Sequence, residues 1–176
     1  DVQILRETDT LAVHCPRSDM AGAAGAAGVV EYTRAGVSVG LGTDGFASDM
    51  LGELTVGSLL CRHSAQDPEA GFTELPQALF QSNAAFASRI FGTELGVLRT
   101  GAAGDVIVLD YVPPTPLTAE NLDLHLIAAS GTARVSATIT AGKLLMQDHI
   151  LLVTDEEQLL EGAQKQAAGL WRRANA

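Results

Sequence analysis

Residues 37–50 read VSVGLGTDGFASDM, and the class of fold can be inferred from this stretch. Over residues 37–42, bulky valine and leucine alternate with serine and glycine, which is the two-residue period of a β-strand. Asp44 follows on the small-residue face, and Gly45 would let the backbone turn sharply. A carboxylate at the carboxyl end of a strand that precedes a helix is typical of catalytic sites in parallel α/β proteins. The alternative is a plain turn residue, because Asp-Gly is a common turn pair.

A second short strand is predicted upstream, at residues 11–16 (LAVHCP), and Pro16 would end it. His14 lies on the small face of this strand. We expect that face to be continuous with the face that carries Asp44, so that both polar side chains lie at one edge of a parallel sheet. A histidine in this position suits a structural role as well as a catalytic one, and both interpretations stay open at this point.

Helical signals surround the two strands. Residues 49–65 favour a helix with an apolar side that includes Leu54, Gly57 and Ser58, and His63 is expected at its surface. Further helices are predicted at residues 1–8, 29–35, 73–91 (two helices, capped by Thr73 and Asn83), 118–129 (capped by Thr118) and 154–173 (a Thr154–Glu157 capping box).

The pattern becomes β-rich after Gly92. Residues 95–110 predict two strands joined by a glycine-rich turn, and residues 136–152 predict a hairpin that turns at Ala141 and Gly142, with a further strand near Ile150. These strands are too few to close a β-sandwich by themselves.

Composition and charge exclude several classes of function. The chain has 176 residues, of which 47% are hydrophobic, so it can bury a core and is not disordered. Its net charge of −10 argues against nucleic acids and anionic membranes as partners. No apolar run approaches the ~20 residues that span a bilayer, and the polar N-terminus is no signal peptide. Two cysteines make no disulfide framework, so a reducing, cytoplasmic setting is expected.

Residues 20–28 (MAGAAGAAG) raise the alternative of a phosphate-binding loop. They lack the GxGxxG spacing, and no GK[ST] follows them. Close packing of a loop against a helix explains the small residues better than nucleotide binding does.

Five motifs occur in a defined order: HCPRSDM (14–20), GVSVGLGTDG (36–45), SNAAFASRIFG (82–92), LGVLRTGAAGDVIVLD (95–110) and TAGKLL (140–145). This series resembles the C-terminal part of an amidohydrolase-superfamily enzyme of the cytosine deaminase and chlorohydrolase branch. It is most similar to the SsnA-like aminohydrolases, and the resemblance covers nearly the whole chain.

The resemblance implies an α/β fold, namely the C-terminal portion of a metal-dependent (β/α)8 TIM barrel with half of a small β-sandwich. Residues 1–92 would supply barrel strands seven and eight and the helices that follow. Residues 93–152 would form the sandwich portion, and residues 153–176 a helix that packs back on the barrel.

The resemblance also implies a site and an activity. One divalent metal ion, zinc or iron, would lie at the barrel mouth, and Asp44 matches the strand-eight aspartate that binds the metal and relays the proton of the attacking water. Such a metal lowers the pKa of bound water towards about 7. His14, Ser18 and Ser48 would shape the substrate pocket. The reaction would hydrolyse a non-peptide C–N bond of a small heterocyclic molecule, with dechlorination left open.

Two departures from the family pattern affect this hypothesis. The strand-seven motif usually reads Ser-Asn, whereas this chain has Ser18-Asp19. None of the four histidines forms a His-x-His pair, so the remaining ligands would come from an upstream half of the same enzyme. The resemblance further implies a homodimer. The alternatives are a catalytically incomplete fragment and a metal-free binding or scaffold protein.

Overall fold

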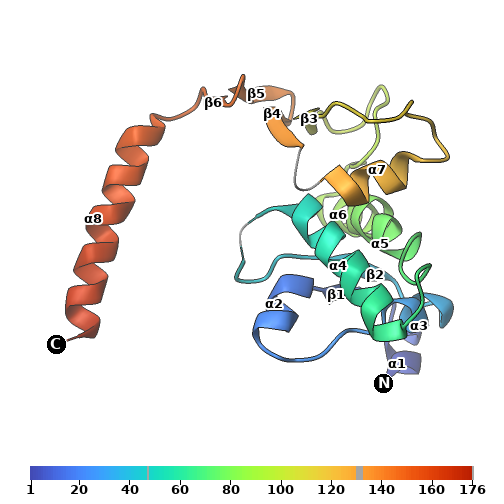
Figure 1. The fold of residues 1–176 in the computed structure, drawn as a ribbon. Coiled ribbons are helices and arrows are strands. Elements are labelled where there is room, and N and C mark those ends of the chain that lie inside the picture. The colour runs from blue at the N-terminus through green and yellow to red at the C-terminus, as the bar shows by residue number, and fades with distance from the viewer. Residues whose placement is uncertain (47, 130–132, 176) are drawn as a thin grey trace. The chain divides into compact units, whose positions relative to one another are not determined.

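The computed structural model describes residues 1–46, 48–129 and 133–175, which form two compact units (Figure 1). Unit 1 comprises Asp1–Ala103 and Tyr111–Arg134, and unit 2 comprises Gly104–Asp110 and Val135–Ala176. No helix in the described ranges is both long and apolar enough to cross a membrane.

A parallel strand pair organises unit 1. Strand β1 (Ala12–His14) pairs with β2 (Val39–Leu41), with Ala12 opposite Val39 and His14 opposite Leu41. Between them the chain forms α2 (Pro16–Ala21), an exposed loop, and α3 (Val29–Arg34). The two strands and the parallel α/β arrangement were both predicted from the sequence, and the structure confirms them.

The core of unit 1 is built on β2, all of whose residues are buried. Helix α4 (Met50–Ala65) follows β2 and covers it, as Figure 1 shows. The core cluster consists of Val29, Val39, Leu41, Leu54, Leu75, Ala78 and Ile127. Gly57 of α4 permits close approach to α2, because a Cβ atom there would lie 2.9 Å from Pro16 Cγ.

The predicted helix pair at residues 73–91 is one continuous helical segment. It consists of α5 (Glu74–Gln77), a π-helical turn η1 (Ala78–Ser82) and α6 (Asn83–Phe91). The prediction that Asn83 caps the second helix is therefore wrong, since its φ of −60° and ψ of −45° are helical. Gly92 ends the segment in the left-handed conformation, with a φ of 65°.

Two shorter helices complete unit 1. Helix α1 (Val2–Glu7) lies at the N-terminus, and α7 (Leu122–Ala129) packs on α4 through a hydrogen bond from Thr55 Oγ1 to the carbonyl of Ile127. Helix α7 begins later than predicted. Thr118 does not cap it, because α7 begins only at Leu122, and Thr118 lies in the preceding turn, where its N–H donates to Asn121 Oδ1 at 2.8 Å.

Unit 2 contains a four-stranded sheet in the order β3-β4-β5-β6, formed by Val106–Asp110, Arg134–Thr140, Lys143–Gln147 and Ile150–Leu151. The predicted hairpin is confirmed, with positive φ at both turn residues, Ala141 and Gly142. The first of the two strands predicted in residues 95–110 is wrong, because only β3 forms there.

Helix α8 (Glu156–Ala174) ends unit 2 and has no buried residue. Asp155 caps it by accepting a hydrogen bond from Gln158 N at 3.1 Å, so the predicted capping box of Thr154 and Glu157 is wrong by one residue. Its predicted packing on a barrel, and the predicted boundaries at residues 92 and 152, stay predictions.

Candidate functional site

Asp44 lies in the loop directly after β2, with its carboxylate exposed. Its backbone has a φ of 46°, so Asp44 itself, rather than Gly45, takes the left-handed conformation that aspartate tolerates better than most residues. Ser18 Oγ donates a hydrogen bond to Asp44 Oδ2 at 2.7 Å. This bond joins α2, the helix that follows β1, to the loop that follows β2, as expected for polar groups at the carboxyl ends of parallel strands.

Ser18 is carried by α2, a helix of six residues with no side-chain hydrogen bond at its N-cap, Cys15. Pro16 occupies the first helical position, where its missing N–H costs nothing. The first free N–H of the helix therefore belongs to Arg17. It donates to Glu53 Oε2 of α4 at 3.1 Å, so that a carboxylate distant in sequence replaces the missing cap.

Arg17 and Glu53 also form a side-chain ion pair, with Nε donating to Oε1 at 2.6 Å. The side chain of Glu53 is 0% exposed and that of Arg17 23% exposed. Arg17 Nη2 donates in addition to the carbonyl of Asp49, the N-cap of α4, at 2.8 Å. One guanidinium thus joins the start of α2 to the start of α4. We call Arg17, Ser18, Asp44 and Glu53 the strand-end cluster.

Asn83 supports β2 from its other edge. The N–H of Leu41 donates to Asn83 Oδ1 at 3.2 Å, and Asn83 Nδ2 donates to the carbonyl of Leu41 at 2.8 Å. A Cβ atom at residue 40 would lie 2.5 Å from Asn83 Oδ1, so this close approach requires Gly40. The side-chain amide of Asn83 thus bonds both backbone groups of Leu41, as a neighbouring strand would, three residues before Asp44.

His14 is 4% exposed and its Nδ1 lies 2.9 Å from Asp19 Oδ2. Its pairing with Leu41 places it on the side of the sheet that carries Leu41. The small face belongs instead to Gly42, where a Cβ atom would lie 2.8 Å from Val13 Cγ1. The prediction that His14 shares the small face of β2 is therefore wrong, because strand pairing sets the register and the pattern within one strand does not.

Two other residues lie near Asp44 in sequence or space. Ser48, in the same loop, is exposed, and its side chain makes no hydrogen bond to the part of the chain that the structure describes. Burial raises the pKa of the Cys15 thiol, and the negative charges of Asp19, Asp44 and Glu53 raise it further. Cys15 is therefore a protonated thiol at neutral pH and a poor nucleophile.

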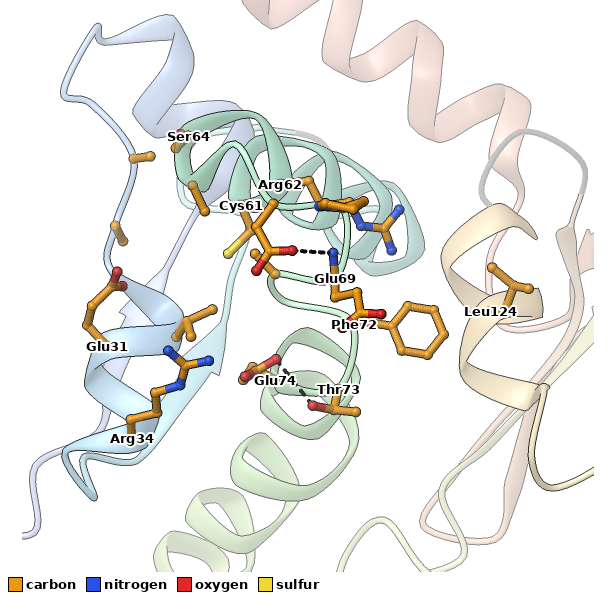
Figure 2. A pocket seen from close by; sticks show the side chains of 17 residues that line it. Glu31, Arg34, Cys61, Arg62, Ser64, Glu69, Phe72, Thr73, Glu74 and Leu124 are labelled. Atoms are coloured by element: carbon orange, nitrogen blue, oxygen red, sulfur yellow. Dashed lines mark hydrogen bonds between the residues drawn. The ribbon is translucent and has the colours of Figure 1, made fainter.

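A cavity of about 780 Å³ in unit 1 lies apart from the strand-end cluster. Figure 2 shows that α3 contributes Glu31 and Arg34 to it, and that Cys61 and Arg62 come from the end of α4. Burial raises the pKa of the Cys61 thiol, as do the charges of Glu74 and Glu31. None of the predicted site residues lines this cavity.

Residues 1–145 match the model of the amidohydrolase family. The chain belongs to this family. It is 36% identical to the 5'-deoxyadenosine deaminase of Methanosarcina mazei over 100% of its own length and 41% of that protein. It is 38% identical to the 5-methylthioadenosine/S-adenosylhomocysteine deaminase of Pelotomaculum thermopropionicum over 98% of its length and 40% of that protein. The chain thus spans about two fifths of these relatives.

Solved structures show the same fold. An adenosine deaminase from Xanthomonas campestris with bound zinc superimposes with a TM-score of 0.80 at 24% identity, over 97% of this chain and 40% of that one. The atrazine chlorohydrolase TrzN from Arthrobacter aurescens, complexed with zinc, gives a TM-score of 0.69 at 23% identity, over 94% and 38%. The amidohydrolase fold confirms the predicted fold class, a C-terminal portion of a TIM barrel. The narrower likeness to SsnA-like enzymes stays a prediction.

A metal ion fits this amidohydrolase chain at Asp44 only as part of a larger ligand set. Ser18 engages Oδ2 of the carboxylate, while Oδ1 makes no hydrogen bond within the described residues. Among those residues, no three histidine, cysteine, aspartate or glutamate side chains converge closely enough to hold a metal ion. The chain can therefore offer one oriented carboxylate oxygen, a suitable ligand for zinc or iron.

Sequence reasoning missed Arg17, Glu53 and Asn83. Glu53 offered one signal, since it interrupts the apolar side of α4 next to Leu54 and is fully buried. A charged residue in such a position is almost always paired. The identity of its partner could not be read from the sequence, because Arg17 lies 36 residues away.

Proposed function

We propose that this chain is the C-terminal part of a metal-dependent aminohydrolase that deaminates an adenosine analogue. Family membership and the deaminases similar to it over its whole length support this proposal. The structural observation that carries it is the exposed Asp44 carboxylate after β2, with Oδ2 held by Ser18 and with Oδ1 making no hydrogen bond to the residues that the structure describes.

Asp44 would be one ligand of a single zinc or iron ion, and an upstream part of the enzyme would supply the others. The metal, when bound, lowers the pKa of water and polarises the carbon under attack. Ser18 holds the Asp44 carboxylate in one orientation. A carboxylate fixed in this way binds a metal ion or accepts a proton more readily than one that rotates freely. Asp44 accepts the proton of the attacking water and returns it to the leaving nitrogen, so that the C–N bond breaks and ammonia departs.

Several finer assignments belong to the same proposal. Ser18 and Ser48 would lie on the substrate side of the site, while the buried His14 would help to shape the pocket from behind through its contact with Asp19. The substrate would be a small molecule bearing an aromatic amino group. A homodimer in the cytoplasm, built with the upstream half of the enzyme, completes the proposal. The names of the relatives favour an adenine nucleoside over a pyrimidine or triazine.

The test compares Asp44→Asn with Asp148→Asn in the full-length protein that contains this chain. Asp148 is a matched control, because it is exposed, lies in a turn and has a similar φ of 50°. We expect Asp44→Asn to lower zinc affinity and the release of ammonia from 5'-deoxyadenosine more than about 100-fold, since even outer-shell substitutions cost 10- to 100-fold. Asp148→Asn should leave both unchanged.

The outcomes separate the alternatives. Metal retention and deamination that survive Asp44→Asn would remove Asp44 from the site. A full-length protein that holds metal but releases no ammonia from adenosine analogues would contradict the substrate class alone. A wild-type protein that binds no divalent metal would favour the non-enzymatic scaffold.

A further inference from the structure

We infer that Glu53 is a positioning residue, which holds the first turn of α2 so that Ser18 orients the Asp44 carboxylate. The inference rests on the proposed function and extends it to a residue that touches neither substrate nor metal. It combines three contacts: Glu53 with the N–H of Arg17, Glu53 with the Arg17 guanidinium, and Ser18 with Asp44.

The N-terminus of α2 depends on Glu53 for its geometry. A helix of six residues is too short to be stable from its own backbone hydrogen bonds. Its N-cap supplies no side-chain acceptor, and Glu53 Oε2 takes the N–H of Arg17 instead. The negative charge of Glu53 also favours this position, since helix N-termini carry a partial positive charge.

The second carboxylate oxygen fixes the position further. Because Oε1 accepts from Arg17 Nε while Oε2 accepts from the Arg17 N–H, one carboxylate is bound at two points of the same residue. Ser18 is the next residue along the chain. A shift in the backbone at Arg17 would therefore move Ser18 Oγ away from Asp44 Oδ2, from which it is now 2.7 Å.

The same guanidinium restrains the loop that carries Asp44. This loop leaves β2 after Leu41 and enters α4 at Asp49. Arg17 Nη2 binds the carbonyl of Asp49, while Arg17 Nη1 lies 3.6 Å from the Asp49 carboxylate. Arg17 thus contacts the loop through Nη1 and Nη2, which Glu53 does not bind, so the hydrogen bonds of Glu53 act on the α2 side, at the backbone that precedes Ser18.

A role in stability alone does not require this arrangement. Well-packed apolar side chains often replace a buried ion pair without loss of stability, whereas directed hydrogen bonds define one geometry. Glu53 is fully buried beside Leu54, where an apolar residue would fit the core. The two possible roles of Glu53 differ in one respect. A positioning residue affects the metal site through Ser18, whereas a residue that only stabilises the fold affects it independently of Ser18.

A double-mutant cycle tests this difference in the full-length protein. The variants are Ser18→Ala, Glu53→Gln and the double variant, and the measurements are the zinc dissociation constant, by competition with a chromophoric chelator, and kcat and KM for 5'-deoxyadenosine. We expect each single substitution to weaken zinc binding or kcat about 10- to 100-fold with KM little changed. When Ser18 is already alanine, adding Glu53→Gln should change the zinc dissociation constant and kcat by less than about twofold.

The inference would be overturned if the loss in the double variant equalled the product of the two single losses. It would also be overturned if Glu53→Gln kept the wild-type zinc affinity and kcat. Should Glu53→Gln fail to fold, Arg17→Lys serves in the same cycle, because it weakens the side-chain bond and retains the backbone N–H. Arg17→Lys should reduce zinc affinity and kcat less than Glu53→Gln does, and this reduction should also be absent when Ser18 is alanine. If the wild-type protein binds no zinc, the proposed function fails first, which the wild-type measurement shows separately from the cycle.

Discussion

Two contacts between a nitrogen-bearing side chain and a carboxylate, one in each unit, have similar distances and different surroundings. Arg17 Nε lies 2.6 Å from Glu53 in unit 1, and His149 Nε2 lies 2.9 Å from Asp110 in unit 2. The side chain of Glu53 is 0% exposed, whereas that of Asp110 is 59% exposed. Distance alone therefore does not rank the two contacts. The degree of burial does, because water replaces a lost partner at the surface and cannot do so in the core.

The same contrast extends to backbone contacts made by asparagine. Asn83 and Asn121 each accept a hydrogen bond from a backbone N–H and donate one to a backbone carbonyl. Asn83 does so at the buried strand β2, and Asn121 in an exposed turn. The buried contacts hold the segments that lead to Asp44 and to its partner Ser18, whereas the exposed contacts lie away from Asp44.

The largest effect is expected for Arg17→Met. This change leaves the Glu53 carboxylate buried without its cation, which costs about 3–5 kcal/mol when a buried pair is broken. The opening free energy of α4, measured by hydrogen exchange in the full-length protein, should fall by this amount. Arg89→Met is the control, because it removes the exposed pair of Arg89 with Asp9 and should cost less than about 1 kcal/mol. Equal losses in the two variants would contradict the role of burial.

A smaller loss is expected for Asn83→Ala. The N–H and carbonyl of Leu41 would lose their partners at a buried strand, at a cost of about 1–3 kcal/mol. Exchange of the Leu41 amide should accelerate, and Asn121→Ala should change the amide of Thr118 much less. A protected Leu41 amide in Asn83→Ala would mean that another backbone group pairs with β2 in the full-length protein.

Sequence patterns predicted the elements whose formation depends mainly on residues close together in the chain. The strands at Asp44 and His14, the helix after Asp49 and the hairpin at Ala141 all follow from local periodicity and turn residues. The resemblance of five motifs predicted the family.

The missed features depend on contacts between distant segments. The side of the sheet that His14 occupies is set by pairing with β2. The role of Asn83 is set by its contact with the edge of β2 that does not pair with β1. The partner of Glu53 lies on a different helix. Local propensity alone could not predict these contacts, and it favoured a helix cap at Asn83 because asparagine is common there.

The smallest effect is expected for Asp110→Asn in unit 2. The amide of asparagine can accept from His149 Nε2 or donate to it, and water reaches the site, so the loss should stay below about 1 kcal/mol. The difference in stability between Asp110→Asn and the wild-type protein should become smaller still in high salt, because exposed charges are screened. Thermal unfolding of the full-length protein at low and high salt measures both effects. A loss above about 2 kcal/mol that does not respond to salt would contradict the exposure of this pair, and the contrast with Glu53 would then no longer hold.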